Sequence, residues 1–414
     1  MGYFLLFRRL SKRSGTALPM HGFGGGMKHN KLPTLPNASC STGTSSPPPA
    51  LHEAQEPIYV TRSILPDQEE YNACTERIFA TRHLTNHGAC VNELEARLSA
   101  CLNVPHLALC ANGTLALQLA LRAASLAGKE VVTTPFSYAA TVSALLWEGC
   151  TPVFADIDEE TLCLNPQTLS ERITSATTGV LPVHIYGNIC DVDALETVAR
   201  EAGLAVVYDA AQCFGSSYNA RSVLDYGDFS ACSFHATKVF HTAEGGCVVS
   251  RTQEGLEMLR LMRACGHYGD RHVCLGTNAK LSELHAAVGL CLLDSFGGNI
   301  NGRRKVSQIY DTLLSTRGLR RPVLREGLTY NHAYYPVIFD TEKSLLRVVA
   351  NLNRENIFPR RYFYPALNTL PYLPRHQPCP VAESVAKRAL CLPLYRELSE
   401  TDVERICAIV HRSI

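Results

Sequence analysis

The sequence predicts an α/β fold, in which a large, mainly parallel sheet carries helices on both of its faces. Between residues 107 and 250 short apolar runs alternate with helical segments, which is the pattern of repeated strand–helix units. Polar residues directly follow several of these runs, at the edge where open α/β sheets bind ligands. From about Gly302 the order of elements changes, which predicts a smaller C-terminal α+β domain. We therefore expect an extension over 1–55, a large domain over 56–300 and a small domain over 301–414.

The composition argues against several classes of protein. The 414 residues carry a net charge of +1 without a long basic block, so nothing predicts nucleic-acid binding. No run reaches the roughly 18 apolar residues of a membrane span, and we expect no membrane partner. The 17 cysteines are scattered without a CxxC pair, which predicts free thiols in a cytoplasmic protein and no metal site.

Residues 1–55 differ from the rest of the chain. An apolar start precedes Arg8 and Arg9, the reverse of the order in a secretory signal, and a Ser/Thr/Pro-rich stretch runs from Ser39 to Pro49. Such a composition cannot bury enough apolar surface to order itself, so we predict a disordered extension. An organelle-targeting segment remains the alternative, because the stretch is basic, contains serine and is poor in acids.

The first elements of the folded part lead to a glycine turn. Helices are predicted after Pro66 and over 91–102. A short strand from Leu107 then meets Gly113 and Thr114, which open a helix that is apolar on nearly all sides. The free N–H groups at that helix start, with the Thr114 hydroxyl, would form an anion site, although a plain strand-to-helix turn has the same pattern.

The alternation then continues through three strands and a helix. The strands are predicted at 131–136, 152–157 and 180–185, and Tyr138 follows the first of them, where a tyrosine is most often part of the core. The helix over 191–202 begins at an aspartate cap and stops at a glycine.

Two titratable residues follow the next strands. Asp209 ends a predicted strand that starts at Ala205, and an acid there either faces a ligand or caps a helix. Lys238 lies on a polar connection between predicted core strands over 229–234 and 246–250. A lysine held on such a rigid connection can be partly desolvated, lose its proton and attack a carbonyl, whereas an ordinary surface lysine is solvated.

This pair of residues suits one cofactor. Pyridoxal phosphate needs a lysine for its covalent attachment and an acid that keeps its pyridine nitrogen protonated. Because Asp209 and Lys238 both follow strands of the predicted sheet, in this order, the sequence favours a pyridoxal phosphate site.

The stretches 205–215 and 233–246 resemble those of the DegT/DnrJ/EryC1/StrS sugar aminotransferases, a branch of the fold type I pyridoxal phosphate enzymes. The resemblance runs from about Leu65 to the C-terminus and implies an aspartate-aminotransferase-like fold. It implies that Lys238 binds the cofactor covalently and acts as base and acid, while Asp209 pairs with the pyridine nitrogen. It further implies cofactor contacts for six more residues, namely Gly113, Thr114 and Ser233 at the phosphate, Tyr138 on the ring face, Gln212 at the ring hydroxyl, and Asn278.

For Asn278, the resemblance implies a contact with a second subunit. In the family the matching asparagine reaches the phosphate of the neighbouring subunit, which implies a homodimer with shared active sites. Lys280 stands where many members have arginine, and this puts any arginine-specific role in doubt. A plain helix-start role for Asn278 stays open.

The C-terminal part is predicted to hold helices over 306–314, 342–353 and 402–410 and a strand over 334–339. The resemblance implies sugar-substrate contacts for a segment that includes Arg360, Arg361, Tyr364 and Asn368, the last standing where many members have histidine. The two arginines would face a diphosphate or a donor carboxylate, or else form a solvated edge.

The activity implied by the resemblance is amino transfer from L-glutamate to a nucleotide-linked keto-6-deoxy sugar. The arginine-containing segment is similar to that of the subgroup acting on dTDP-linked sugars, which favours dTDP-4-dehydro-6-deoxyglucose as acceptor and an amino sugar nucleotide for polysaccharide assembly as product. Amination at C3 and a non-catalytic, cofactor-binding or regulatory protein remain alternatives. Some relatives are dehydratases with histidine in place of the lysine, and Lys238 argues against that class.

Overall fold

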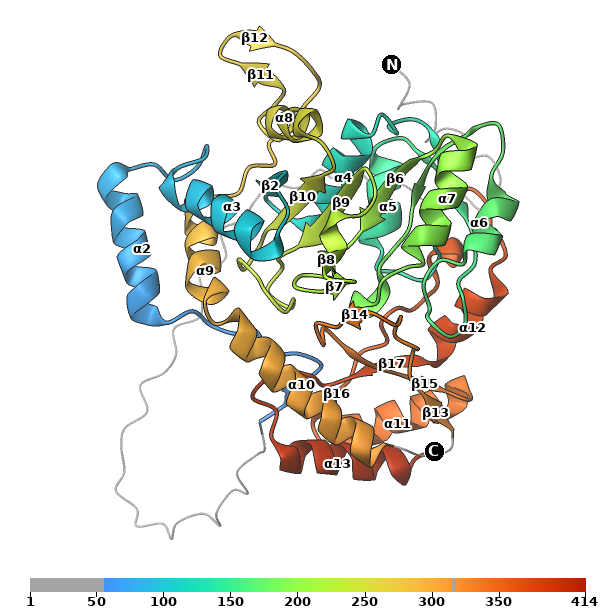
Figure 1. Cartoon of the computed structure of the whole chain (residues 1–414). Coiled ribbons are helices and arrows are strands. Elements are labelled where there is room, and N and C mark those ends of the chain that lie inside the picture. Colours follow the sequence, from blue (N-terminus) through green and yellow to red (C-terminus); the bar gives the residue numbers. More distant parts are fainter. Residues whose placement is uncertain (1–55, 315–317) are drawn as a thin grey trace, which may run out of the picture. The chain divides into compact units, whose positions relative to one another are not determined.

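The structure, a computed structural model, describes residues 56–314 and 318–414. The predicted disordered extension over 1–55 lies outside these residues. Within them, a seven-stranded sheet forms the centre of the fold, in the order β2-β10-β9-β6-β5-β3-β4 (Figure 1). Its strands are β2 (Leu107–Cys110), β3 (Glu130–Thr133), β4 (Thr151–Phe154), β5 (Thr177–Leu181), β6 (Ala205–Asp209), β9 (Phe229–Ser233) and β10 (Gly246–Ser250).

All strands of this sheet except β10 run in the same direction. β10 pairs antiparallel with β2 and β9, whereas the pairs from β9 across to β4 are parallel. Every residue of β9 and β10 is buried, so both faces of these strands are covered. This burial explains why the two strands are almost continuous apolar runs in the sequence, and the predicted mainly parallel sheet is confirmed.

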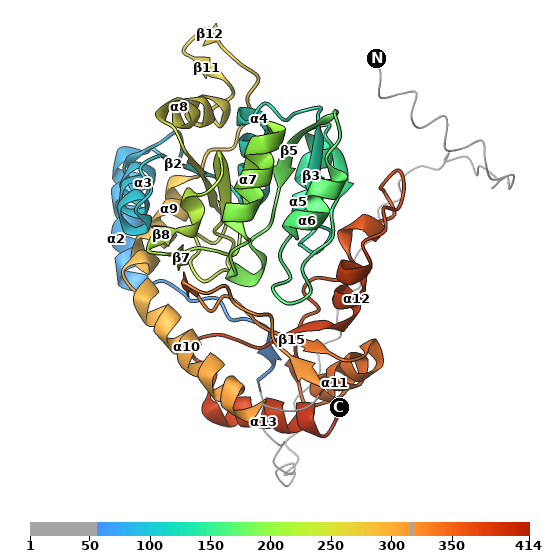
Figure 2. The same ribbon diagram turned by 45° about the vertical axis from the view of Figure 1, so that its right-hand side comes forward.

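Helices cover both faces of the sheet, as predicted (Figures 1 and 2). Because successive side chains of a strand face opposite sides, Val207 packs with apolar residues of α4, α5 and α8, while Val206 and Tyr208 pack with those of α3, α7 and α9. The helices of this part are α2 (Gln68–Thr81), α3 (Ala89–Leu102), α4 (Gly113–Ala123), α5 (Ala140–Trp147), α6 (Pro166–Arg172), α7 (Val192–Ala202), α8 (Gln253–Met262) and α9 (Glu283–Leu293).

A second, antiparallel sheet has a core of its own. Its three strands are β13 (Leu319–Arg320), β15 (Tyr335–Phe339) and β17 (Ala389–Leu392). Three helices pack their apolar residues against β15 and β17 in a separate cluster, namely α10 (Phe296–Leu313), α11 (Glu342–Arg354) and α13 (Glu400–His411). The second sheet lies on the side of the large sheet where α10 passes (Figures 1 and 2).

The remaining elements are short. They are β1 (Ile58–Tyr59), which pairs in parallel with β16 (Ile357–Phe358), a small sheet of β7 (Ser217–Tyr218), β8 (Arg221–Ser222) and β14 (Leu328–Thr329), α12 (Pro380–Arg388), and single 3₁₀ turns at Ile185–Gly187, Val223–Asp225 and Leu367–Thr369. A hairpin of β11 (His267–Tyr268) and β12 (Arg271–His272) projects from the body beside α8 (Figures 1 and 2).

Some element boundaries differ from the prediction for local reasons. Helix α10 begins at Phe296, ten residues before the predicted start at 306. The early start was not predicted because Gly297 and Gly298 are poor helix formers, and tertiary packing overrides their preference. Strands β3 and β5 end early, at Thr133 and Leu181, since the sequence places a proline one or two residues later and proline offers no N–H to a sheet.

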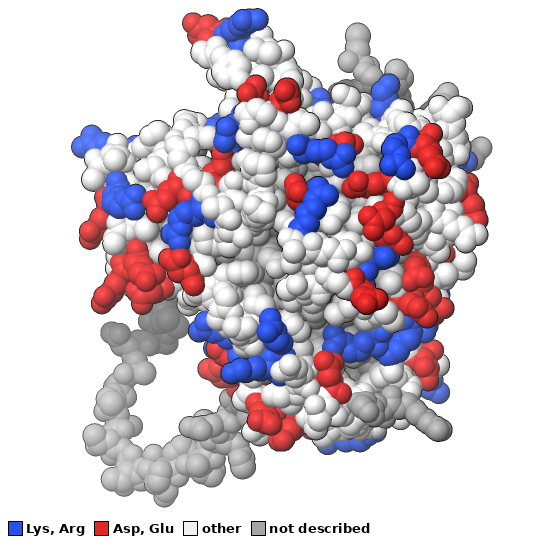
Figure 3. Space-filling model, viewed as in Figure 1, with Lys and Arg blue, Asp and Glu red and all other residues white. Residues whose placement is uncertain are grey.

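The surface of the described part carries charges of both signs. On the face drawn in Figure 3, the basic and acidic side chains are interspersed over the body of the molecule. Across residues 56–314 and 318–414, no helix combines the length and the apolar character that crossing a membrane requires.

Candidate active site

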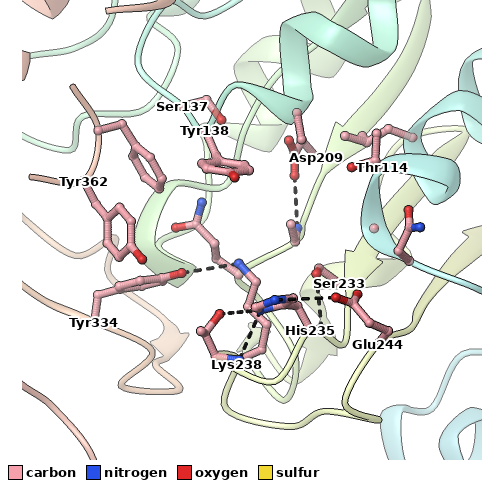
Figure 4. A pocket seen from close by; sticks show the side chains of 18 of the residues that line it. Thr114, Ser137, Tyr138, Asp209, Ser233, His235, Lys238, Glu244, Tyr334 and Tyr362 are labelled. Atoms are coloured by element: carbon pink, nitrogen blue, oxygen red, sulfur yellow. Dashed lines mark hydrogen bonds and ion pairs between the residues drawn. The ribbon is translucent and has the colours of Figure 1, made fainter. Parts of the chain in front are cut away.

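A cavity of about 580 Å³ opens where β6 and β9 end and α4 begins (Figure 4). Its walls come from the large sheet and from two segments of the C-terminal part, around residues 334 and 360–363. Seven of the eight predicted cofactor residues line it, namely Gly113, Thr114, Tyr138, Asp209, Gln212, Ser233 and Lys238. The structure therefore gathers in one cavity residues that are up to 125 positions apart in the sequence.

Asp209 is the last residue of β6 and is buried. Its Oδ2 accepts a hydrogen bond from Thr141 Oγ1 at 2.7 Å, and its Oδ1 accepts one from the Ala211 N–H at 3.1 Å. Thr141 Oγ1 also lies 2.7 Å from Ser137 Oγ. Burial raises the pKa of Asp209 above its ordinary value, although Thr141, Ala211 and the positive charge of Lys238 act against this rise. A cation next to the carboxylate would therefore favour its ionised form.

Lys238 lies on a connection that its own hydrogen bonds hold rigid. The Phe234 N–H donates to Gly245 O at 2.8 Å, and the Ala236 N–H donates to Ala243 O at 2.8 Å. From the segment after β1, Ser63 Oγ donates to Ala236 O at 2.7 Å.

The amino group of Lys238 points into the cavity. Its Nζ donates to the Tyr334 hydroxyl at 3.3 Å (Figure 4). Burial lowers the pKa of Lys238, but Tyr334 and Asp209 raise it, and the net shift is upward. Asp209 and Lys238 thus stabilise each other's charged form across the cavity.

The opposite end of the cavity is built for an anion. A Cβ at Gly113 would lie 2.7 Å from Ser233 Cβ, so only glycine lets α4 start this close to β9. Asn112 caps the helix, with its Oδ1 accepting from the Leu115 N–H at 2.9 Å. The first N–H groups of a helix have no partner within the helix, and together with the Thr114 and Ser233 hydroxyls they suit a phosphate group.

Two side chains flank the space between these ends. The ring of Tyr138 is 62% exposed and lies against the cavity, with its centroid 6.5 Å from that of Phe363 (Figure 4). Gln212 Oε1 accepts from the Tyr186 N–H at 2.6 Å, which leaves the Gln212 amide nitrogen as the donor toward a ligand. An acid, a site for an anion, a lysine and an exposed aromatic face together fit pyridoxal phosphate.

Three of the four predicted substrate residues, Arg360, Arg361 and Tyr364, line a cavity in the structure. Arg360 lines the cavity, whereas Arg361 donates to Glu342 Oε1 at 2.7 Å and stacks 3.7 Å from the Tyr364 ring centroid. Arg361 and Tyr364 line an adjoining cavity of about 390 Å³. Arg360 also lines this adjoining cavity, so both arginines reach it, while only Arg360 of the two reaches the main cavity.

Asn368 does not have the position expected of a substrate contact. It is 1% exposed and lines neither cavity. Its Nδ2 donates to Gln377 O at 2.8 Å and to Glu383 Oε1 at 2.6 Å. The geometry gives this residue a structural role in place of the predicted substrate contact.

Asn278 is exposed and lies outside the cavity of its own chain, where its Oδ1 accepts from Lys280 Nζ at 2.7 Å. The predicted contact with a partner's phosphate thus requires a second subunit.

Sequence reasoning missed five residues of the cavity wall, namely His235, Glu244, Tyr334, Tyr362 and Phe363. It also missed Thr141, which does not line the cavity but donates a hydrogen bond to Asp209. Thr141 had a usable signal, because it follows Ser137 by about one helical turn, just after the strand predicted over 131–136. Tyr334 and Tyr362 had none, since they reach the cavity only through the packing of the C-terminal part.

Comparison with known proteins identifies the family. Residues 66–411 match the DegT/DnrJ/EryC1/StrS aminotransferase family. The chain belongs to this family. The predicted enzyme class, an aminotransferase, is thereby confirmed.

Individual relatives of this aminotransferase extend over most of its length. A dTDP-4-amino-4,6-dideoxy-D-glucose transaminase of Shigella dysenteriae is 37% identical over 363 residues, covering 86% of this chain and 99% of that protein. A GDP-perosamine synthase of Vibrio cholerae is 32% identical, covering 78% and 90%. Among solved structures, DesI in the presence of its TDP-sugar product superposes with a TM-score of 0.82 at 33% identity, covering 86% of this chain and 93% of that one. The predicted fold class is confirmed by this match.

Proposed function

We propose that this aminotransferase moves the amino group of L-glutamate to a nucleotide-linked keto-6-deoxy sugar, with dTDP-4-dehydro-6-deoxyglucose as acceptor and pyridoxal phosphate as cofactor. The observation that carries the proposal is the meeting of Lys238, Asp209 and the Gly113–Ser233 cradle in one cavity. The names of the relatives from Shigella dysenteriae and Escherichia coli, both dTDP-4-amino-4,6-dideoxy-D-glucose transaminases, support a dTDP-linked sugar aminated at C4.

Different residues of the cavity bind the cofactor and transfer the proton. Bound pyridoxal phosphate supplies an electron sink and carries the amino group from donor to acceptor. The start of α4, with Thr114 and Ser233, binds its phosphate, and the Asp209 carboxylate, oriented by Thr141, holds the proton on its pyridine nitrogen. Once the donor has displaced Lys238 from its covalent link, the freed Nζ takes a proton from the donor's α-carbon. It then returns this proton to the carbon on the other side of the amino nitrogen, which completes a 1,3-proton shift.

Other parts of the wall bind and shield the substrate. The rings of Tyr138, Tyr362 and Phe363 exclude water from the reacting carbon. Arg360 gives the cavity a positive charge that suits the carboxylate of the donor or the diphosphate of the sugar nucleotide. The adjoining cavity with Arg361 and Tyr364 offers further room for the nucleotide.

We further propose a cytoplasmic homodimer with shared active sites. Asn278 is exposed and follows the projecting β11–β12 hairpin, a position from which a side chain can reach a second subunit (Figure 1). The 16 cysteines of the described residues are free thiols, which suits a reducing compartment. The product, an amino sugar nucleotide, would serve polysaccharide assembly.

The decisive experiment is a substrate panel. Protein loaded with pyridoxal phosphate is incubated with L-glutamate and with dTDP-, UDP- and GDP-linked 3-keto and 4-keto sugars, and the products are read by mass spectrometry and NMR. We expect amination of the dTDP-linked 4-keto sugar and none with Lys238→Ala. Amination at C3 or of another nucleotide sugar would correct the substrate, and loaded protein that aminates no keto sugar would favour a regulatory or binding role.

A further inference from the structure

Tyr334 contacts the one amino group on which the proposed reaction depends. Lys238 Nζ lies 3.3 Å from the Tyr334 hydroxyl oxygen and 5.9 Å from the centroid of its ring (Figure 4). Because attraction to an aromatic face fades beyond about 6 Å, the hydrogen bond is the main interaction of this pair. The lysine and the tyrosine come from opposite walls of the cavity, 96 positions apart in the sequence.

Packing fixes the Tyr334 ring in this position. Its centroid lies 5.7 Å from those of Tyr186 and Tyr362, the latter in an edge-to-face arrangement at 86°. Its carbonyl oxygen accepts from the Tyr330 hydroxyl at 3.1 Å, and the chain enters the buried strand β15 at the next residue. The hydroxyl is thus held toward the cavity without help from a ligand.

The surroundings of Lys238 Nζ single out this hydroxyl. The titratable groups that face Nζ are Tyr334, Asp209, Cys232, Cys213 and Tyr362, with His235 and Glu244 farther along the wall. Cys232 and Cys213 are buried thiols, which are weak hydrogen-bonding groups. In the loaded enzyme the Asp209 carboxylate would be engaged by the pyridine nitrogen. Of the two tyrosine hydroxyls, that of Tyr334 is the one hydrogen-bonded to Nζ among the described residues.

We propose that Tyr334 is a positioning residue for Lys238. Its hydroxyl oxygen accepts a hydrogen bond from Nζ once the amino donor has displaced the lysine from the cofactor. Nζ takes up a proton from the donor's α-carbon, donates to Tyr334 as an ammonium group, and then returns the same proton. Tyr334 itself neither gains nor loses a proton. This role rests on the proposed function, whereas the contact between the two residues does not.

The test uses Tyr334→Phe, which removes one oxygen and keeps the ring contacts with Tyr186 and Tyr362. The apo-protein is trace-labelled with acetic anhydride at a series of pH values, and the labelling of Lys238 is followed by mass spectrometry. The hydroxyl favours the charged amine, so its loss should move the labelling midpoint down by about one pH unit. In the loaded enzyme, kcat should fall about 10–100-fold with a much smaller change in the KM of L-glutamate.

Tyr310→Phe is the matched control. It also removes one buried tyrosine hydroxyl, but that hydroxyl donates to Pro393 O at 3.0 Å in the second core and does not line the cavity, so its loss should leave the labelling midpoint of Lys238 unchanged. Tyr334→His, which still offers a hydrogen-bonding ring atom, is a second variant should the phenylalanine chain fail to fold, and its midpoint should lie nearer to that of the unchanged protein.

The two readouts separate the inference from the proposed function. A midpoint in Tyr334→Phe equal to that of the unchanged protein overturns the contact, and an unchanged kcat overturns the positioning role. If the unchanged protein aminates no keto sugar, the proposed function fails, yet the labelling still decides whether Tyr334 holds the lysine.

Discussion

The Thr141 hydroxyl and the Ala211 N–H both donate hydrogen bonds to Asp209, so its carboxylate has one orientation in the cavity. Asp209→Asn keeps the size of the side chain but removes the charge that would hold the proton on the pyridine nitrogen. We expect kcat to fall by roughly three orders of magnitude, because a neutral ring is a poor electron sink. Steady-state kinetics with saturating cofactor measures this loss.

A matched control for this substitution lies at the other end of the same strand. Asp228 Oδ2 accepts from the Val206 N–H at 2.8 Å, far from the cavity lining. Asp228→Asn should leave kcat within about twofold. If Asp209→Asn retained nearly full activity as well, Asp209 would be only a structural cap.

Lys238 gives a second residue-level prediction. Lys238→Ala removes the amine but leaves the anion cradle of Gly113 and Ser233 and the Tyr138 ring in place. The variant should therefore bind pyridoxal phosphate without a covalent link and show no measurable turnover. Dialysis and borohydride treatment followed by mass spectrometry check the first point, and the transaminase assay checks the second. Appreciable turnover would rule out Lys238 as the catalytic base.

At the scale of elements, the edge strand β2 is sealed by side chains. Glu95 of α3 accepts from the Leu109 N–H at 3.0 Å, and Arg263, which follows α8, donates to Leu109 O at 2.6 Å. The two side chains also pair with each other at 2.8 Å, and Arg263 is 1% exposed. The N–H and carbonyl oxygen of Leu109 at the β2 edge are thus taken up and cannot pair with another strand.

Breaking this pair should cost stability without touching the chemistry. Arg263→Met leaves the buried Glu95 carboxylate with only Arg260 as a charged partner, so we expect a loss of roughly 3–5 kcal/mol in the free energy of unfolding. Urea unfolding measures this loss, and the double variant Glu95→Leu/Arg263→Met should recover part of it. A single variant as stable as the unchanged protein would contradict the proposed sealing role.

The same pair predicts a dependence on pH. Burial raises the pKa of Glu95, but Arg263, the Leu109 N–H and Arg260 together hold it below its ordinary value. Its stabilising contribution is therefore present above the pKa of an unfolded glutamate and is lost as pH falls through the lower, folded value. Glu95→Gln should reduce the pH dependence of the unfolding free energy in that acidic window.

Some of the helices and strands could be predicted from the sequence, and others could not. Buried strands such as β9 and β10 were predictable because they are short apolar runs between polar turns, and α7 because an aspartate and a glycine bound it. The first turn of α10 was not, since Gly297 and Gly298 are poor helix formers and tertiary packing overrides that preference.

At the scale of the whole molecule, some residues of the site could be predicted from the sequence and others could not. The residues contributed by the large sheet were predictable, because strand ends meet at one edge. Tyr334 and Tyr362 were not, because they reach the cavity only through the way the C-terminal part packs against the large sheet. The predicted division into domains at residue 300 remains a proposal, and α10 runs through that point as one continuous helix.

The shared-site proposal gives a prediction for two chains together. An obligate dimer should bury more than about 2,000 Å². A Lys238→Ala chain paired with an Asn278→Asp chain should form one intact site and one doubly damaged site, with about half the activity per dimer. Co-expression with two tags, followed by assay of the purified heterodimer, tests this. An inactive heterodimer, or an active species that sediments as a monomer, would leave Asn278 without a role at the partner's phosphate.

The segment between β1 and α2 has a practical consequence for truncation of the gene. Ser63 supports the lysine connection through Ala236 O, and His241 of that connection lies 2.9 Å from Ile64 O, although neither Ser63 nor Ile64 lines the cavity. The family match begins only at residue 66. An expression fragment over 66–414 would contain every predicted catalytic residue and still lose these supports and the strand pairing of Ile58. We expect it to bind pyridoxal phosphate more weakly than a fragment over 56–414, so the first codon of a minimal enzyme belongs ahead of Ile58.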